Sequence, residues 1–391
     1  MSAKKIIVVG GGIFGATAAL SLAQRGESVT LLDAGIIPEP QASSTDISKL
    51  IRADYGDDSF YTQLMTKAFE GWRNWNSKFH RPLFHEVGAL LLTKDEMRPG
   101  EFEWESYQCL RSHGYTLRRL ENSLGKSEFT SWNAQEYTDG YYNPRAGWAE
   151  SGAVTEEVIK WAEEAGVQVQ HQQQCSELLK QGGRVCGVRT ANDSELTADE
   201  VVLCAGAWNL KFLPELAGML TVVGQPVVYF RPSNPEAFVP PAFVPWAADI
   251  ARTGWYGFPV NKDGLLKIAN HGPGYKIDFS KPLPIVEQET IDAARAFLRA
   301  SIPQAVDLPL VGTRVCLYCD SLDGDFLISR HPDVKGLTVA TAGSGHGFKF
   351  APILGDLTAN AVHSIDDDCL QRFRWRTSST EKSEQARYTG E

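Results

Sequence analysis

The sequence predicts an α/β fold in which a domain with a parallel sheet is interleaved along the chain with a second domain, an antiparallel sheet plus helices. Strand and helix patterns alternate at the start of the chain and return after residue 142, and alternating aromatic and apolar stretches lie between them. With 391 residues, the chain is long enough for two or three domains. Its hydrophobic content of 43% suffices for full-sized cores, which excludes a disordered chain or a small disulfide-stapled protein.

The chain opens with a strand, a helix and a second strand. Residues 5–9 are a short β-branched run that ends in glycine, which predicts a buried strand. Residues 13–24 show a helical pattern that ends at Gly26, and a second strand follows at residues 29–32. Because parallel strands are joined by crossover helices, we expect helices on both faces of this sheet.

The same pattern returns after residue 142. A helix is predicted over residues 155–165, and another begins at Pro352. Buried strands are predicted over residues 200–204 and 337–340. We therefore assign the parallel-sheet domain to residues 1–85, 142–215 and 325–391.

The intervening segments have a different composition. Residues 95–141 contain few β-branched runs, and residues 214–309 combine many prolines with alternating stretches such as 227–230, which is typical of an antiparallel sheet. We assign residues 86–141 and 216–324 to the second domain. Residues 377–391 are polar, and we expect them to form a loose tail.

Composition also limits the classes of partner. The net charge is −10 and no basic run offers a surface for phosphate backbones, so we expect no nucleic acid partner. Residues 6–23 are the only stretch that resembles a signal peptide or membrane span, but four glycines weaken that alternative and favour a protein without membrane contact. Seven scattered cysteines and a C-terminus without a peroxisomal tripeptide favour a cytoplasmic location.

A glycine motif lies in the turn after the first strand. Gly10, Gly12 and Gly15 form the pattern Gly-x-Gly-x-x-Gly, which permits a tight turn and close approach of a pyrophosphate. Asp33 ends the second strand about 20 residues further on, where a carboxylate accepts the ribose hydroxyls of an adenine dinucleotide. This acid disfavours NADP relative to FAD or NAD, and the lack of a second such motif implies one dinucleotide. The alternative, a glycine-rich helix start without a ligand, leaves Asp33 unexplained.

Four later motifs carry a resemblance to a known family. They are Val-Val-Leu-Cys-Ala-Gly-Ala-Trp at residues 201–208, Tyr-Gly-Phe-Pro at 256–259, Arg-Val-Cys-Leu-Tyr at 314–318 and Gly-Ser-Gly-His-Gly-Phe-Lys-Phe at 343–350. With the opening motif, they resemble monomeric sarcosine oxidase and its relatives, which include N-methyltryptophan oxidase, pipecolate oxidase and the amadoriases of the D-amino-acid-oxidase superfamily. The resemblance spans nearly the whole chain. It implies a Rossmann-type FAD-binding domain interleaved with a substrate (catalytic) domain.

The resemblance implies one FAD and a set of residues that hold it. In this family a cysteine at the position of Cys316 is joined to the 8α carbon of the flavin. Cys316 could instead be a structural thiol, or could form with Cys319 a redox pair or half of a zinc site, although no second Cys-x-x-Cys exists and we expect no metal. The amides of residues 343–347 are expected to cradle the pyrimidine edge of the flavin, or simply to begin a helix. The expected FAD contacts are Gly10, Gly12, Ile13, Phe14, Gly15, Asp33, Ser44, Thr45, Lys49, Ala205, Gly206, Trp208, Cys316, Gly343, Gly345, His346, Gly347, Phe348 and Lys349.

The resemblance places Lys267 near flavin N5, where the family uses a lysine to activate oxygen. An ammonium in a water-poor site stabilises negative charge that develops on oxygen far more than water does. Without the resemblance, a lone lysine after two leucines is more often a surface residue with a partly buried stem. The expected catalytic set is Lys267, His271, Lys49 and His346.

The substrate contacts follow from the same resemblance. Arg52 and Lys349 match the pair that binds the substrate carboxylate, and Tyr256, Phe258 and Tyr318 are expected to line the amine pocket. The alternatives are that Arg52 and Lys349 are surface charges and that the three aromatic residues belong to the hydrophobic core. Lys49 departs from the sarcosine oxidases, which have arginine there, and resembles the amadoriases.

The resemblance therefore predicts an FAD-dependent oxidase of the C–N bond of a secondary amino acid, such as a sarcosine-like N-alkyl amino acid. The products are an imine that hydrolyses and hydrogen peroxide. Alternatives in the same class are a fructosyl amino acid oxidase and a pipecolate-type oxidase of cyclic imino acids. Alternatives in other classes are a flavin dehydrogenase that reduces a partner protein and a non-catalytic flavin-binding protein. We expect a monomer whose partners are a small amino acid and oxygen.

Overall fold

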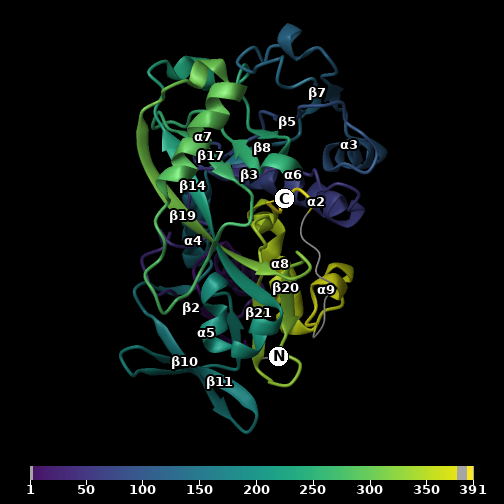
Figure 1. Cartoon of the computed structure of the whole chain (residues 1–391). Coiled ribbons are helices and arrows are strands. Elements are labelled where there is room, and N and C mark those ends of the chain that lie inside the picture. The colour runs from purple at the N-terminus through teal and green to yellow at the C-terminus, as the bar shows by residue number, and fades with distance from the viewer. Residues whose placement is uncertain (1–2, 377–384, 391) are drawn as a thin grey trace.

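The computed structural model describes residues 3–376 and 385–390 of the chain. Figure 1 shows two layers of structure, with a parallel sheet in the lower part and a larger sheet in the upper part. The α-helices are α1 (Ile13–Gln24), α2 (Ser59–Asn76), α3 (Phe102–Ser112), α4 (Ser151–Glu164), α5 (Asn209–Phe212), α6 (Ile250–Thr253), α7 (Gln288–Ser301), α8 (Ala351–His363) and α9 (Asp368–Phe373).

The lower sheet has six strands, and the predicted strands form its centre. Five strands run parallel and β20 pairs antiparallel at one edge. The predicted opening strand and helix agree with β1 and α1, and the other predicted strands agree to within one residue at each end. In spatial order the strands are β20 (Leu327–Arg330), β21 (Leu337–Thr341), β13 (Glu200–Leu203), β1 (Lys5–Val9), β2 (Ser28–Leu32) and β9 (Gln168–Gln170).

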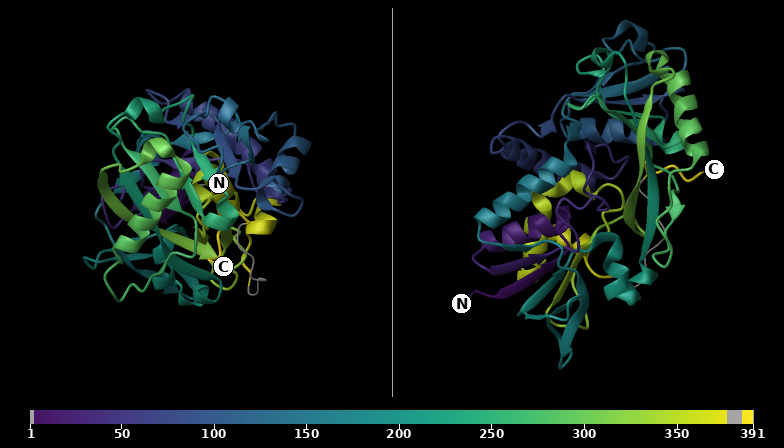
Figure 2. Two further views of the ribbon diagram at one scale, coloured as in Figure 1. Left: turned by 45° about the horizontal axis from the view of Figure 1, so that its top comes forward. Right: turned by 90° about the vertical axis from the view of Figure 1, so that its left-hand side faces the viewer.

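The two faces of this sheet are covered by different kinds of structure. On one face, Ile6 and Val8 share a core with residues of α1, α4 and α8, which the right-hand view of Figure 2 shows stacked side by side. On the other face, Ile7 and Val9 pack against a three-stranded sheet formed by β10 (Cys175–Gln181), β11 (Arg184–Thr190) and β12 (Glu195–Thr197). The expectation of helices on both faces is therefore wrong. A small sheet with one apolar face buries the parallel strands equally well.

The upper sheet has nine strands from two separate parts of the chain, and most pairs are antiparallel, as predicted. One pair, β15 with β5, is parallel and joins the two parts. Since these strands come from both segments that we assigned to the second domain, we propose that division for the protein. The strands are β18 (Tyr275–Lys276), β14 (Leu220–Phe230), β17 (Leu266–Asn270), β16 (Trp255–Gly257), β15 (Trp246–Ala248), β5 (Ala89–Thr93), β7 (Asp139–Asn143) and β6 (Arg118–Arg119), with β19 (Leu310–Ser321) paired to β14.

A long ribbon connects the two layers. Strands β14 and β19 pair from Leu220 and Ser321 at one end to Phe230 and Leu310 at the other. Leu220 belongs to the core beneath the parallel sheet, whereas Phe230 belongs to the core of the upper layer. A separate small sheet of β3 (Lys49–Ile51), β8 (Gly147–Ala149) and β4 (Phe84–His85) brings Lys49 to the junction.

The C-terminal residues are more ordered than predicted. Residues 377–384 and 391 of the expected loose tail lie outside the described residues. Residues 385–390 contradict the expectation, because Ala386 is fully buried and the Tyr388 amide donates to the His271 carbonyl at 3.0 Å. Arg387 also forms an ion pair of 2.5 Å with Asp320. Polar composition did not reveal these specific partners.

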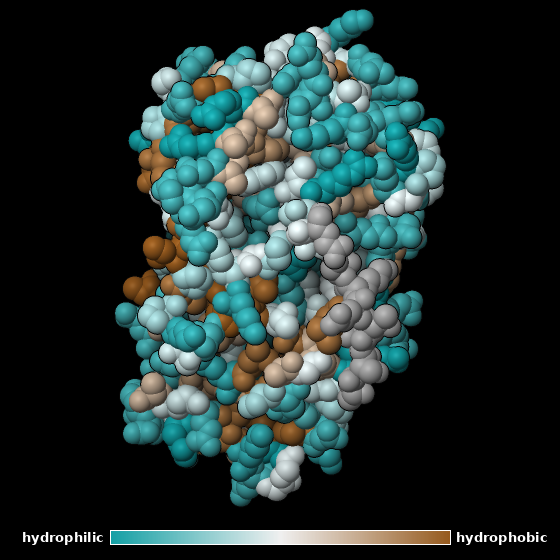
Figure 3. Space-filling view, in the orientation of Figure 1, coloured by the Kyte–Doolittle hydropathy of each residue, from teal (hydrophilic) through white to brown (hydrophobic). Residues whose placement is uncertain are grey.

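The outer surface in the view of Figure 3 is mainly hydrophilic, with apolar side chains in scattered patches. Within residues 3–376 and 385–390, no helix has both the length and the apolar character that a membrane crossing requires.

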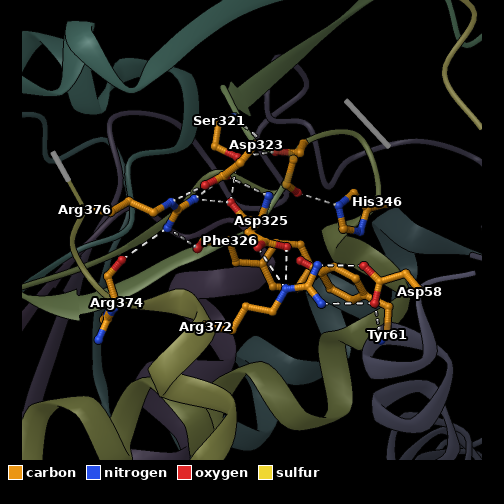
Figure 4. Close-up of polar contacts among 12 residues, drawn as sticks. Asp58, Tyr61, Ser321, Asp323, Asp325, Phe326, His346, Arg372, Arg374 and Arg376 are labelled. Carbon is orange, nitrogen blue, oxygen red and sulfur yellow. Dashed lines mark hydrogen bonds and ion pairs between the residues drawn. The ribbon is translucent and has the colours of Figure 1, made fainter. Parts of the chain in front are cut away.

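An arginine cluster fastens α9 to the rest of the protein. Arg372 donates to Asp58 at 2.6 Å and to Asp325 at 2.8 Å, as Figure 4 shows, and its side chain is 29% exposed. Removing it leaves two carboxylates without this partner, so we expect Arg372→Met to lower the free energy of unfolding by about 1–3 kcal/mol. The measurement is urea unfolding followed by circular dichroism.

The control is Arg25→Met. Arg25 pairs at 3.3 Å with Asp356, whose side chain is 70% exposed. A more exposed pair contributes little, so we expect a loss below about 1 kcal/mol. Equal losses in the two variants would contradict a specific role for the Arg372 cluster.

Candidate active site

The turn between β1 and α1 shows why two of its glycines are needed. Gly10 has φ +104°, and a Cβ there would lie 2.6 Å from the Cys204 carbonyl oxygen. A Cβ on Gly15 would lie 1.8 Å from the Gly10 carbonyl oxygen. Both positions exclude a larger side chain, so α1 packs directly against the ends of β1 and β13. The Ser44 hydroxyl accepts from the Ile13 amide at 2.8 Å and so satisfies one donor at the start of α1.

Asp33 lies beside this turn, at the end of β2. Its carboxylate accepts from the Gly11 amide at 2.6 Å and from the Gly35 amide at 2.9 Å. These bonds fix the side chain, and an ionised carboxylate retains acceptor sites for other donors. The position therefore suits recognition of ribose hydroxyls.

A cavity of about 580 Å³ runs from Asp33 to Gly345. This volume lies within the range of about 300–1,000 Å³ typical of ligand and cofactor sites. Most of the predicted FAD contacts line it, and the site therefore fits a dinucleotide. The lining residues among the predicted contacts are Gly10, Gly12, Ile13, Phe14, Asp33, Ser44, Lys49, Ala205, Gly206, Trp208, Gly343, Gly345, Gly347 and Phe348. Five others do not line it, namely Gly15, Thr45, Cys316, His346 and Lys349.

The glycine-rich turn before α8 differs from the predicted cradle. The amides of His346 and Gly347 both donate to the Gly343 carbonyl at 2.8 Å, and the Ser344 amide donates to the Cys319 carbonyl at 3.0 Å. Three of the five amides are therefore used within the protein, because this turn closes into a short 3₁₀ helix ahead of α8. The cradle therefore stays a prediction, and it rests on the two remaining amides of the run, those of Gly343 and Gly345.

A second, smaller cavity of about 50 Å³ adjoins the first. Both are lined by Lys49, Tyr318, Gly345 and Phe348, so the two cavities share a wall. The small cavity brings together the predicted catalytic and substrate residues Lys49, Arg52, Tyr256, Phe258, Lys267, His271, Tyr318, His346 and Lys349.

Lys267 is one of the most deeply buried polar residues. Its side chain is 1% exposed, and its ammonium donates to Asp46 Oδ2 at 2.6 Å and to the Ser48 carbonyl at 2.7 Å. Nζ also lies 4.8 Å from the centre of the Phe258 ring. Burial lowers the pKa of Lys267 to about 8, although the nearby Asp46 carboxylate opposes this shift. The alternative of a surface lysine is therefore excluded.

Arg52 and Lys349 approach the same aromatic ring. The Arg52 guanidinium carbon lies 5.4 Å and the Lys349 ammonium 4.6 Å from the centre of the Tyr55 ring. Both side chains are nearly buried, which excludes ordinary surface charges. Burial raises the pKa of the adjacent Asp54 carboxyl, while Arg52 and Lys349 act in the opposite direction. The pair suits an anionic group of a small ligand.

The two predicted histidines occupy different positions. His346 lies between the Tyr55 hydroxyl, 3.1 Å from Nδ1, and the Gly324 carbonyl, 2.9 Å from Nε2. A carbonyl only accepts, so Nε2 carries a proton. The His271 ring lies 6.1 Å from that of Tyr318. The geometry of His346 suits positioning, and catalytic roles for both histidines stay predictions.

Cys316 lies behind the wall of the large cavity. Its side chain is buried, and its sulfur lies 3.6 Å from Lys49 Nζ, whose residue lines both cavities. Cys319 lines the large cavity itself, and burial raises the pKa of its thiol to about 11. Residues three apart on a strand point to opposite faces, which disfavours a Cys316–Cys319 redox pair. In the described part of the chain, no cluster of His, Cys, Asp or Glu suits a metal ion.

Several residues of this site had no role predicted from the sequence. Asp46, Asp54 and Tyr55 surround the cations, and Ile250 lines the small cavity. Asp46 and Asp54 lie within a few residues of Lys49 and Arg52 in the sequence. This close spacing of acidic and basic residues was the signal that could have indicated a role for the two aspartates.

Comparisons with known proteins agree with this geometry. The model of the DAO family, described as FAD-dependent oxidoreductase, matches residues 5–361. Monomeric sarcosine oxidase from Bacillus sp. (strain B-0618) is 28% identical, over 94% of this chain and 95% of its own. N-methyl-L-tryptophan oxidase from Citrobacter koseri is 27% identical, over 91% and 93%.

A solved structure supports the fold. Amadoriase I from Aspergillus fumigatus, a fructosyl amine:oxygen oxidoreductase, superposes with a TM-score of 0.83 at 24% identity, covering 100% of this chain and 94% of its own. The family predicted from the sequence motifs is confirmed. The chain belongs to the DAO family of FAD-dependent oxidoreductases.

Proposed function

We propose that this protein is an oxidase of small secondary amino acids. The observation that carries the proposal is the small cavity, which is lined by the buried cations Lys267, Arg52 and Lys349 and adjoins the large cavity. In the reaction, a secondary amine, oxygen and water give a carbonyl compound, a shorter amine and hydrogen peroxide. The bound flavin would accept the hydride and pass the electrons to oxygen.

Arg52 and Lys349 would bind the substrate carboxylate. An arginine offers a planar fork of donors, whereas a lysine acts as a point charge. Fixing the carboxylate positions the carbon that bears the amine, so orientation contributes to the rate. The same cations disfavour a protonated amine and so favour the neutral form that reacts.

Lys267 would act in the oxygen half of the reaction. It lines the small cavity near the wall that the two cavities share, and its ammonium is shielded from water. A fixed positive charge in such a place stabilises negative charge that develops on oxygen. Lys49 lines both cavities and would contact the flavin.

The size of the small cavity supports a small substrate. One water needs about 10–15 Å³ of comparable volume, so 50 Å³ holds only a few groups of that size. A sarcosine-like amino acid fits better than a fructosyl amino acid, although the Lys49 pattern resembles the amadoriases. A pipecolate-type ring is intermediate in size.

A substrate panel tests the proposal. We expect oxygen uptake and stoichiometric peroxide with sarcosine or another short N-alkyl amino acid, with weaker activity towards pipecolate and a fructosyl amino acid. An oxygen electrode coupled to a peroxide assay measures both. Flavin reduction without oxygen uptake would instead indicate a dehydrogenase.

Covalent attachment at Cys316 is a separate prediction. Lys49, which lines both cavities, lies 3.6 Å from the Cys316 sulfur, so Cys316 lies one residue away from the cavity that fits the cofactor. We expect a yellow acid precipitate and a fluorescent band on a denaturing gel, both lost in Cys316→Ser. Cys319→Ser is the matched control and should keep the band. Flavin released into the acid supernatant of the unmodified protein would refute attachment.

The carboxylate contact gives a third prediction for this site. Arg52→Ala should cost about 2–4 kcal/mol, or roughly 30- to 1,000-fold in kcat/KM, because a charge-assisted contact in a dry pocket is lost. Arg52→Lys should restore little, since the fork is lost.

The direct measurement titrates the flavin absorbance with a small carboxylate that has no amine. Binding should weaken in Arg52→Ala and Lys349→Ala. It should be unchanged in Arg295→Ala, whose arginine stacks on Phe230 away from the small cavity. Unchanged binding in all three variants would contradict an amino acid substrate.

A further inference from the structure

Asp46 holds a network of charges beside the small cavity. Its side chain is fully buried, and its carboxylate accepts from the Lys267 ammonium at 2.6 Å and from the Tyr229 hydroxyl at 2.8 Å. Lys49 and Arg314 add positive charge at 3.8 Å and 3.9 Å. These three cations outweigh the effect of burial and hold the pKa of the Asp46 carboxyl well below its usual range. Asp46 is therefore ionised.

The network is anchored from several directions, so groups other than Lys267 also hold Asp46. Tyr229 lies on β14 and Arg314 on β19, the two strands of the connecting ribbon. The Ile47 amide donates to Asp46 Oδ1 at 2.7 Å. Lys267 lies on β17, the neighbour of β14, and contacts Asp46 from the remaining side.

This arrangement fixes where the Lys267 ammonium lies. An ammonium has three donors, and Lys267 uses two of them on Asp46 and the Ser48 carbonyl. Among the described residues, the structure shows no hydrogen-bond partner for the third. One donor is therefore left for a ligand in the small cavity that Lys267 lines.

The same contact compensates for the burial of a charge. An unpaired ammonium in a dry site loses its proton, because the neutral form is cheaper to bury. Lys49 adds to this tendency by repulsion, whereas Asp46 opposes it. Of the residues packed around the ammonium, Asp46 makes the closest charged contact.

We propose that Asp46 is a positioning residue for the oxygen half-reaction, which places the Lys267 ammonium beside the cofactor cavity and keeps it charged at neutral pH. The inference rests on the function proposed for Lys267, and neither the resemblance nor the comparisons assign a role to Asp46.

The test removes the charge and keeps the shape. Asp46→Asn retains an oxygen that can accept from Lys267, but no longer favours the charged form. In the parent enzyme, reoxidation of the reduced flavin should slow as pH rises through the pKa of Lys267, which is about 8. In Asp46→Asn that midpoint should fall by about one to two pH units, which lowers the rate at neutral pH about twofold for a shift of one unit and about tenfold for a shift of two. Lowering the pH should restore the rate.

Stopped-flow absorbance measures this rate separately from flavin reduction by substrate. Asp54→Asn is the matched control, because Asp54 is a second buried carboxylate that lies beside Arg52 and Lys349. It should weaken or alter substrate binding but leave the midpoint of reoxidation where it is. An unchanged midpoint in Asp46→Asn would overturn the inference.

Lys267→Met separates this inference from the proposed function. If Lys267→Met leaves reoxidation as fast as in the parent, the oxygen role of Lys267 is wrong. If it slows reoxidation by orders of magnitude while Asp46→Asn behaves like the parent, only the role of Asp46 is wrong.

A stability measurement gives a readout that does not depend on activity. Asp46→Asn should lower the urea midpoint of the isolated enzyme, because a buried ammonium loses its charged partner. Adding Lys267→Met should restore part of that midpoint, since the uncompensated ammonium is then absent. Strictly additive losses would contradict direct coupling of the two side chains. If Asp46→Asn fails to accumulate, Tyr229→Phe removes a hydroxyl that donates to Asp46 and offsets part of its charge, so the reoxidation midpoint should move upward by a smaller amount. No shift, or a downward shift, would count against the inference.

Discussion

Compensation of buried positive charge is the constraint on which the site depends. Several cations surround a small cavity that excludes most water, and each lies near a carboxylate. Asp46 accepts from Lys267, Asp54 lies beside Arg52 and Lys349, and Asp320 pairs with Arg387. Without such partners, the lysines would lose protons and the arginines would draw water into the cavity. The site can hold a high positive charge because each of these basic side chains lies next to an acidic side chain.

These pairs also require the two layers of the fold to meet as they do. Asp46 comes from the segment after β2, Lys267 from β17 in the upper sheet, and Arg314 from β19. The ribbon of β14 and β19 belongs to both cores, so it sets the distance between the parallel sheet and the upper sheet. The cofactor cavity and the small cavity share a wall for the same reason.

The features of the fold that depend on local sequence patterns were predicted from the sequence. The opening strand, helix and second strand follow from hydrophobic period and glycine position, and Asp33 follows from its distance to Gly15. The resemblance to the family then predicted the residues that line the pocket. The role of Asp46 was not predicted, because it depends on Lys267, more than two hundred residues away. No local pattern in the sequence indicates that these two side chains pair. The small sheet over Ile7 and Val9 was missed because covering a sheet needs only an apolar face, which helices and strands both supply.

Residues 385–390 pack behind two residues that line the small cavity, and Ala386 belongs to the core on one face of the parallel sheet. Gln385 pairs with Asp57 at 2.8 Å, Arg387 lies 5.6 Å from the centre of the Tyr318 ring, and Tyr388 bonds the backbone of His271. This short stretch thus crosses from one half of the protein to the other past two residues that line the small cavity. A substitution in this stretch can therefore move the Tyr318 ring or the His271 backbone without touching Asp33 or the Asp46–Lys267 pair. The shape of the small cavity and the two polar anchors of the site thus depend on different parts of the chain.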